Sequence, residues 1–399
     1  MDFELSEDQE ELRRAACALL DDLAPMARVR QVALSSSAYD VELWSAMASQ
    51  GWMAIDMPES GGGLGMGMVE VAVLCEQLGR HVAPVPYLGT VVARGSLERA
   101  VAAGEVDPSA SLGGLTVQEW VQRLSGAAGP AAVGAVAWSA DGKSVQALPA
   151  DSPAVTPASG RARSEEWLLV GRGDPVVFGP EADLIVVLAT PAPGSPGAGP
   201  PSLFAVVPGP GQRCESQAAM DLTRCLGWLE LDAHPAVRLG GPDAVESLLE
   251  RAASAVSAEM LGSAGRVEEM AVQYAKDREQ FGRAIGSFQA VKHRCADMLV
   301  DIEGMRSIAY YAAWSVGAGA PDATLAASAA KVFCSDAARR VMASGLQVHG
   351  GVGFTWEHDL HLYMKRSQLD QVSFGNAGFH RSRLAGLLRS KAEAGLPVM

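Results

Sequence analysis

One stretch, from Tyr274 to Met298, constrains the possible folds of this chain most strongly. It holds a charged, glycine-broken loop. After the loop, Ser287 can cap a new helix, because its hydroxyl can accept a hydrogen bond from an orphan amide of the first turn. Apolar residues then recur in steps of four and three, at Val291, Cys295, Met298, Ile302, Met305, Ala309 and Ala312. This spacing puts one apolar seam on one face, so it predicts a long buried helix that begins at a loop.

Length, charge and the N-terminal sequence exclude several classes of protein. The chain has 399 residues, of which 48% are hydrophobic, enough for a large core and two or three domains. A net charge of -14 argues against a nucleic-acid partner, because neutralising phosphates requires an excess of basic residues. The opening sequence MDFELSEDQEELRR has no basic segment leading into an apolar run. We therefore expect neither a signal peptide nor a membrane span.

The cysteines and histidines do not form a recognisable metal motif. The six cysteines are scattered and include no C-x-x-C pair, a pattern typical of a reducing cytoplasm and of a protein without a structural metal. His349, His358 and His361 are close in sequence, but no matching cysteine or acidic constellation accompanies them. The sequence therefore predicts a cytoplasmic protein that binds no metal.

Three regions of different character follow one another along the chain. Region 1–106 reads as helical, because Ser6 can cap a first helix and a second is centred on Leu43, Trp44 and Met47. Region 107–241 contains short runs rich in β-branched residues between Gly, Pro, Ser and Asp, which predicts a small antiparallel β domain. The runs are 131–138, 167–170, 184–188 and 203–207. Region 242–399 predicts helices at 243–275, 287–316, 321–351, 357–371 and 379–388.

Two segments of the last region resemble the acyl-CoA dehydrogenase family of flavoproteins. Arg278, Gln280 and Phe281 match the family's R-x-Q-F-G segment. In the usual dimer of that family, this segment contacts the adenine and pyrophosphate end of the neighbouring subunit's FAD, and Gln289 belongs to the same contact. The residue types suit that role, because a guanidinium pairs bidentately with phosphate. Alone, such a segment could equally be a surface arginine in a plain turn.

The second matching segment is Q-x-x-G-G, formed by Gln347, Gly350 and Gly351. In the family it lies against the same part of the cofactor, and glycine lets backbone amides approach a phosphate closely. Two matched segments at family spacing argue against a chance resemblance. The resemblance implies FAD as cofactor and an oxidoreductase of fatty acid or lipid metabolism.

The resemblance covers nearly the whole chain. The glycine-rich run 51–67 is similar to a family loop that leads into a helix, and Asp221, Thr223 and Arg224 match the family's D-x-T-R. The implied fold is α+β and mostly α, with an N-terminal helical domain, a middle antiparallel β domain and a C-terminal four-helix bundle. One stretch departs from the family, because AWSAD at 137–141 stands where members usually carry a T-E-P-x-x-G-S-D-like segment around the flavin.

The implied reaction needs a catalytic base. A carboxylate removes the α-proton of an acyl-CoA thioester while the β-carbon gives hydride to the flavin, and hydrogen bonds hold the thioester oxygen. In most of the family the base is a glutamate in a Y-E-G-T-like turn. Counting on from Arg366 places that position at about Gly375, after Phe374. Glycine cannot take a proton, although its backbone amide could still hold the thioester oxygen.

Other acids remain open as alternatives. Some members place the base on an earlier helix, and counting back from Arg278 reaches Ala252, with Glu250 and Glu259 nearby. Glu259 lies among small apolar residues, where a carboxylate is expensive to bury without a partner. Its structural alternative is a partner for Arg266 or a buried polar contact between helices. Asp370 is expected to be a solvated helix residue.

Three functional hypotheses follow from these residues. The chain is an FAD-dependent acyl-CoA dehydrogenase with its base elsewhere, in a homo- or hetero-oligomer, a dimer or tetramer. Alternatively, it is the base-lacking, non-catalytic subunit of a hetero-oligomeric enzyme, completing the FAD site of a homologue that carries the glutamate. In the third hypothesis, the fold serves as a flavin oxidase or hydroxylase on a carrier-tethered substrate. The family's common electron acceptor is electron-transferring flavoprotein.

Overall fold

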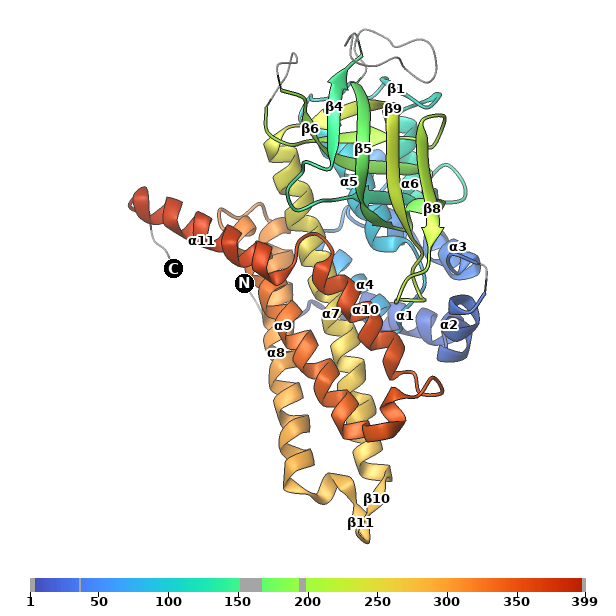
Figure 1. Cartoon of the computed structure of the whole chain (residues 1–399), viewed down its shortest axis with the longest axis vertical. Coiled ribbons are helices and arrows are strands. Elements are labelled where there is room, and N and C mark those ends of the chain that lie inside the picture. Colours follow the sequence, from blue (N-terminus) through green and yellow to red (C-terminus); the bar gives the residue numbers. More distant parts are fainter. Residues whose placement is uncertain (1–3, 36, 151–166, 194–198, 397–399) are drawn as a thin grey trace. The chain divides into compact units, whose positions relative to one another are not determined.

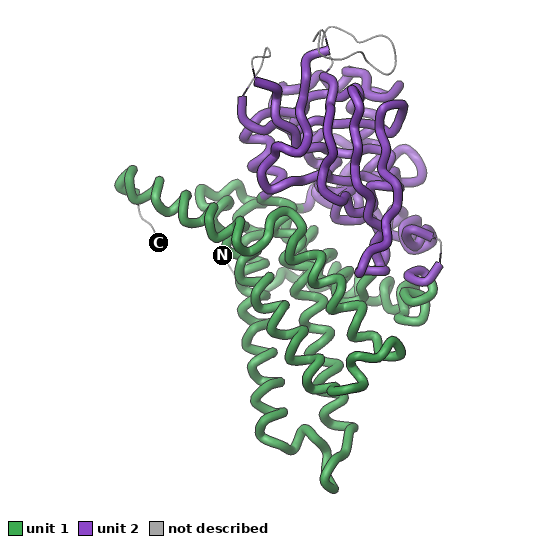
Figure 2. Tube along the Cα trace, in the orientation of Figure 1, with its two compact units in different colours: residues 1–31, 67–83, 250–399 green, residues 32–66, 84–249 purple. Residues whose placement is uncertain are grey.

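The computed structural model describes residues 4–35, 37–150, 167–193 and 199–396. Its contacts divide the chain into two compact units, coloured separately in Figure 2. Unit 1 comprises residues 1–31, 67–83 and 250–399, and unit 2 comprises residues 32–66 and 84–249. Each unit therefore joins segments that are far apart in sequence. The domain boundaries after residues 106 and 241 stay a prediction.

Unit 2 is built on a seven-stranded sheet (Figure 1). Six of its strands follow one another in the order β3-β6-β4-β5-β9-β7, and the seventh, β8, pairs with β9. Because β7 also pairs with β6, the strands β6, β4, β5, β9 and β7 close on themselves. All four strand runs expected in this region are confirmed. The strands are β3 (Gly134–Ala137), β4 (Val145–Pro149), β5 (Trp167–Val177), β6 (Leu184–Pro191), β7 (Ser202–Val206), β8 (Gln212–Gln217) and β9 (Leu226–Gly240).

The sheet is mixed, so the expectation of a wholly antiparallel domain is wrong at one strand. β6 runs parallel to β3 and to β4, whereas it pairs antiparallel with β7. The reason lies in the connection from β5, because a 3-10 turn, η3 (Gly179–Glu181), replaces a two-residue hairpin there. Without a tight hairpin, β6 need not pair with β5, and it lies beside β4 instead.

Besides this sheet, unit 2 contains several helices. The predicted second helix is α3 (Val41–Ser49), in which Leu43, Trp44 and Met47 are buried, and α5 (Tyr87–Ala102) contacts β3 through Thr90. Helix α6 (Val117–Ser125) lies within the region expected to contain only strands. A capping box between Thr116 and Glu119 starts it. The shorter elements are η1 (Trp52–Ala54), η2 (Glu59–Gly61), β1 (Ser111–Leu112) and β2 (Leu115–Thr116).

Unit 1 is helical. Ser6 caps its first helix through a capping box with Gln9, as predicted. The five helices expected after residue 242 are all present, with ends that differ by a few residues. The helices lying wholly or mostly in this unit are α1 (Glu7–Leu23), α2 (Met26–Ala33), α4 (Met68–Arg80), α7 (Pro242–Asp277), α8 (Gln289–Gly317), α9 (Ala323–His349), α10 (Leu360–Val372) and α11 (Ala377–Glu393).

Helix α8 confirms the apolar seam and corrects its starting point. The buried positions of the seam are Met298, Ile302, Met305, Ala309 and Ala312, whereas its first two members are only half-buried. The residue that caps α8 is Phe288, without a side-chain hydrogen bond, so Ser287 as N-cap is wrong. A 3-10 turn, η4 (Ile285–Ser287), takes up the serine and moves the helix start beyond it.

Two glycines let α4 and α7 touch backbone to backbone. A Cβ on Gly79 would lie 2.0 Å from the carbonyl oxygen of Glu259, and one on Gly262 would lie 1.8 Å from that of Glu76. Both distances are far shorter than any real carbon–oxygen contact. The close approach of the two helices therefore requires glycine at both positions.

We predict that Gly262→Ala destabilises the protein by about 2–3 kcal/mol, because the added methyl forces two packed backbones apart. Denaturant unfolding of the purified chain measures the loss. Gly265→Ala is the matched control in the same helix, since a Cβ there meets no atom within 4 Å. The control should be neutral or slightly stabilising. An equal response of the two variants would contradict the close approach.

None of the helices in the described part of the chain is both long and apolar enough to cross a membrane.

Candidate functional site

A tight turn joins α10 to α11 at the position expected for the catalytic base. Phe374 and Gly375 both adopt positive φ angles, 55° and 92°. A Cβ on Gly375 would lie 2.4 Å from Cδ1 of Phe379. A side chain at residue 375 would therefore be strained and would displace the Phe379 ring, and the turn offers only backbone groups there. In the described part of the chain, the Gly375 N–H donates to no protein acceptor.

A buried ammonium group holds one side of this turn. Lys331, in the middle of α9, is fully buried, and its Nζ donates to the carbonyl oxygens of Gln371 and Gly375, each at 3.0 Å. Burial lowers the pKa of Lys331 to about 8, while the charge of Asp370 opposes the shift. The Lys331 ammonium thus places a positive charge beside the carbonyl groups at the C-terminal end of α10, where the helix dipole favours a cation.

A buried imidazole also contacts the turn between α10 and α11. His380 in α11 is fully buried, and its Nε2 lies 2.9 Å from the carbonyl oxygen of Phe374. Burial lowers the pKa of His380 to about 4, so the ring is neutral near pH 7 and must carry its proton on Nε2 to make this bond. The Phe374 carbonyl belongs to the same peptide group as the Gly375 N–H. A hydrogen bond to the carbonyl polarises that peptide and strengthens the N–H as a donor.

Glu259 forms a buried ion pair. Its Oε1 lies 3.0 Å from Nη1 of Arg366, and both side chains are almost fully buried, with 5% and 2% exposed. Nη2 of Arg366 also donates to the carbonyl oxygen of Ala83 at 3.0 Å. The structural alternative, a buried polar contact between helices, is therefore confirmed. The partner expected for Glu259, Arg266, is wrong, because the arginine that pairs with it is Arg366 of α10.

The other acids considered as bases have different surroundings. Glu250 in α7 is half-buried and accepts a hydrogen bond from the Thr324 hydroxyl, and Ala252 is fully buried in the same helix. Asp370 is fully buried, so the expectation that it is solvated is wrong. The reason is that α10 buries the face carrying Arg366, Ser367 and Asp370. The charge of Lys331 faces Asp370 on that side.

The segment with Arg278 forms an exposed hairpin between α7 and α8. Strands β10 (Glu279–Gln280) and β11 (Arg283–Ala284) build it, and Figure 1 shows them at the far ends of the two helices. Phe281 lies at its turn with 92% of its surface exposed and a positive φ of 56°. Arg278, Gln280 and Gln289 are exposed as well.

The segment with Gln347 ends α9. Gln347 and Gly351 are exposed, and a Cβ on Gly350 or Gly351 would meet no atom within 4 Å. The 3-10 turn η5 (Gly350–Phe354) continues from there. The ring centroids of His349 and His358 are 4.5 Å apart, and among the described residues no cysteine or carboxylate joins this pair as a metal-ligand group.

Comparison with known proteins identifies the family. The sequence matches the acyl-CoA dehydrogenase N-terminal domain over residues 6–100 and the acyl-CoA dehydrogenase C-terminal domain over residues 240–388. The chain belongs to the acyl-CoA dehydrogenase family. It is 33% identical to acyl-CoA dehydrogenase IpdE2 of Mycobacterium tuberculosis, over 90% of this chain and 91% of the relative.

Solved structures extend this assignment to the fold. A variant of the Tcur3481-Tcur3483 steroid ACAD superposes with a TM-score of 0.81 at 30% identity, covering 97% of this chain and 99% of the other. The ChsE4-ChsE5 complex of Mycobacterium tuberculosis gives the same TM-score at 28% identity, covering 98% and 99%. The acyl-CoA dehydrogenase fold, with N-terminal helices, a middle β domain and C-terminal helices, is thus confirmed.

FAD is the cofactor of this family, and exposed residues of this chain fit one end of it. Among the described residues, neither the guanidinium of Arg278 nor the amide of Gln347 is engaged by a protein partner, and both are exposed. The open backbone at Gly350 and Gly351 leaves space for a close approach. A cation, an amide and free backbone suit a diphosphate and the base attached to it.

Sequence reasoning missed Lys331 and His380. A lysine in an alanine-rich helix normally lies at the surface, and nothing near it in the sequence indicates burial. His380 follows Asn376, the N-cap of α11, by four residues. That cap indicates where α11 begins, but the carbonyl that His380 contacts is fixed only by the fold.

Proposed function

We propose that this chain is a subunit of an FAD-dependent acyl-CoA dehydrogenase whose catalytic carboxylate comes from a homologous partner. The observation that carries the proposal is the turn at Gly375, which carries no side chain where the family's base is expected, while the buried acid considered as a base, Glu259, is held by Arg366. A carboxylate engaged by a buried guanidinium is a poor proton acceptor, because protonation would leave the cation without its counter-charge.

In this proposal the chain keeps two tasks. Its exposed hairpin offers Arg278 and Gln280, and α9 offers Gln347, to the diphosphate and adenine of FAD. Its Gly375 N–H holds a thioester oxygen, with Lys331 and His380 fixing the turn that carries it. An N–H placed in advance stabilises the negative charge that develops on such an oxygen when the α-proton leaves. Bound FAD supplies the acceptor for the hydride, and electron-transferring flavoprotein is the proposed acceptor from the enzyme.

The similar structures support a hetero-oligomer. Each of the two solved relatives carries the names of two different proteins, and one of them is called a steroid ACAD. We therefore propose a homologous partner with glutamate at the equivalent turn, and a bulky, steroid-type acyl-CoA as substrate. The oxidase and hydroxylase hypothesis gains no support from this turn, which retains a donor for a thioester oxygen.

A second candidate is that the chain catalyses the dehydrogenation alone, with Glu250 as its base. Glu250 favours this reading because it is only half-buried and its carboxylate accepts one hydrogen bond in the described contacts, from Thr324. Such a carboxylate is freer to accept a proton than Glu259 is.

The flavin spectrum separates the two candidates. The purified chain is mixed anaerobically with a panel of acyl-CoAs that includes a steroid side-chain thioester, first alone and then with a coexpressed homologue bearing glutamate at the turn. We expect bleaching of the flavin only with the homologue. Bleaching by the chain alone would overturn partner dependence, and Glu250→Gln and Glu259→Gln would then locate the base.

A further inference from the structure

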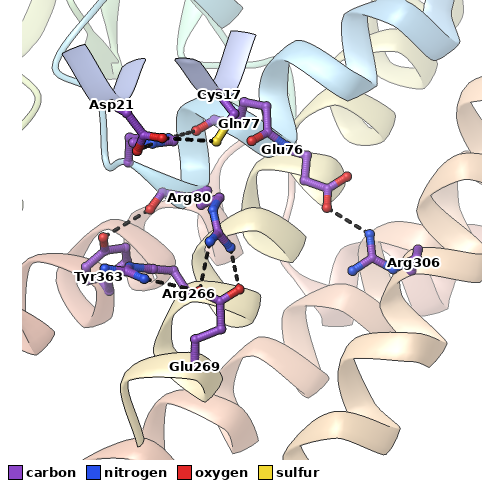
Figure 3. A network of polar contacts seen from close by, with 10 residues as sticks. Cys17, Asp21, Glu76, Gln77, Arg80, Arg266, Glu269, Arg306 and Tyr363 are labelled. Carbon is purple, nitrogen blue, oxygen red and sulfur yellow. Dashed lines mark hydrogen bonds and ion pairs between the residues drawn. The ribbon is translucent and has the colours of Figure 1, made fainter. Parts of the chain in front are cut away.

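Three potential metal ligands meet between α1 and the end of α4, away from the turn and the hairpin described above. Cys17 and Asp21 are four residues apart on α1, so they share one face of that helix. His81 directly follows α4. The thiol sulfur, one carboxylate oxygen and one ring nitrogen all lie within 4.8 Å of one another. Figure 3 shows the side chains of Cys17 and Asp21 close together.

The distances between these atoms suit a small cation. Sγ of Cys17 lies 3.5 Å from Oδ2 of Asp21, and Nε2 of His81 lies 3.0 Å from Oδ1. Ligands of a tetrahedral zinc ion, at the usual bond lengths, are roughly 3.3–3.6 Å apart. The two distances involve different oxygen atoms of Asp21. Binding of one ion therefore requires the three side chains, whose ligand atoms lie within 4.8 Å of one another, to draw closer together.

The histidine is oriented as a metal ligand would be. Its Nδ1 lies 2.8 Å from the carbonyl oxygen of Gln77, so Nδ1 carries a proton and Nε2 is the nitrogen left to bind a metal. Without a metal, Nε2 forms a hydrogen bond with Oδ1 of Asp21, and a bound ion would replace that contact. The imidazole side chain is only 10% exposed, whereas that of Asp21 is 70% exposed. Solvent therefore reaches the cluster from the carboxylate side, where a water molecule can complete the coordination.

The charges around the cluster do not exclude a cation. Arg80 and Arg13 are the cations whose charge reaches Cys17. Arg80 donates to both carboxylate oxygens of Glu269, at 2.6 and 2.8 Å, and Arg13 pairs with Glu10 at 2.6 Å. Arg13 thus has a carboxylate of its own, whereas Arg80 shares Glu269 with Arg266, as Figure 3 shows.

We propose that Cys17, Asp21 and His81 form a zinc-type metal site that ties α1 to the end of α4. Sulfur and imidazole ligands favour Zn²⁺ over Mg²⁺ or Ca²⁺, which prefer oxygen. Binding releases the thiol proton, because a coordinating cysteine is a thiolate. No sequence motif indicates this site, since Cys17 and His81 lie far apart along the chain, and the proposal departs from the sequence-based expectation of a protein without metal.

The test uses the full-length chain after removal of metal with a chelator. Co²⁺ is titrated first, and a thiolate-to-cobalt absorption band in the difference spectrum reports coordination by cysteine. We expect one equivalent of Co²⁺ to produce this band and Zn²⁺ to displace it. The band should disappear in Cys17→Ser and persist in Cys295→Ser, a half-buried helix cysteine outside the cluster.

Competition with a colorimetric chelator then measures zinc affinity. Asp21→Asn and His81→Gln should each weaken binding more than about tenfold, since even outer-shell changes cost that much. His358→Asn, in the histidine pair near η5, should leave the affinity unchanged. Absence of the thiolate band, or equal zinc affinity in the wild type and Cys17→Ser, would overturn the site and leave a hydrogen-bonded cluster.

Discussion

Arg366→Met is expected to lower the free energy of unfolding by about 3–5 kcal/mol, the usual cost of removing one partner of a buried ion pair. Methionine fills much of the arginine volume, so the loss reports mainly on charge. The variant removes the cation that lies 3.0 Å from Glu259, and it also leaves the Ala83 carbonyl without its donor. Chemical denaturation of the purified protein measures the change.

A surface pair provides the control for this prediction. Arg340 pairs with Asp301, and its side chain is 52% exposed. Arg340→Met should therefore cost less than about 1 kcal/mol, because solvent screens such pairs. The double variant Glu259→Gln, Arg366→Met should regain part of the loss, since it no longer buries a lone carboxylate. A loss below about 1 kcal/mol in Arg366→Met itself would show that Glu259 does not depend on this arginine and would reopen its candidacy as a base.

Arg278→Ala is expected to weaken FAD retention roughly 10- to 100-fold, the equivalent of one charge-assisted hydrogen bond to a phosphate. Stability of the chain should not change, because Arg278 is exposed and the described contacts assign it no protein partner. The measurement is the FAD-to-protein ratio after gel filtration over a series of FAD concentrations, with any subunit that copurifies.

Lys276→Ala is the matched control for the loss of one positive charge. Lys276 is an exposed residue in the last turn of α7, two residues before Arg278. It should leave FAD binding unchanged, or lower it only slightly by reducing the local positive charge. If both variants lost FAD equally, the hairpin would attract the cofactor by general charge, and the specific arginine–phosphate pair would be refuted.

Local patterns in the sequence predicted local structure well. The seam of α8 came from steps of three and four, and the strand runs came from β-branched residues between turn residues. The errors at element boundaries were also local. The shift from Ser287 to Phe288 arose from a single 3-10 turn, and α6 was overlooked although Thr116 and Glu119 form a readable capping box.

Pairings between distant residues were not predictable in the same way. Glu259 lies seven residues from Arg266 but 107 residues from its actual partner, Arg366. A reading along the chain favours the near arginine, whereas helix packing selects the far one. The same limit applies to Lys331, whose partners at the turn lie 40 and 44 residues away. The sequence thus named candidate acids, but not the charged groups that pair with them.

The closed path of strands in unit 2 has a consequence for assembly. A sheet whose β7 is paired on both sides exposes few unsatisfied backbone groups. Among its described strands, the free edges of this seven-stranded sheet are the four-residue β3 and the polar, mostly exposed β8. Short or charged edges discourage other chains from adding a strand. In the proposed hetero-oligomer, recognition between subunits is therefore expected to use helices and the exposed hairpin. Selection of a partner then depends on side-chain identity along those helices, so two homologous chains can diverge into distinct, non-interchangeable subunits while their sheets stay alike.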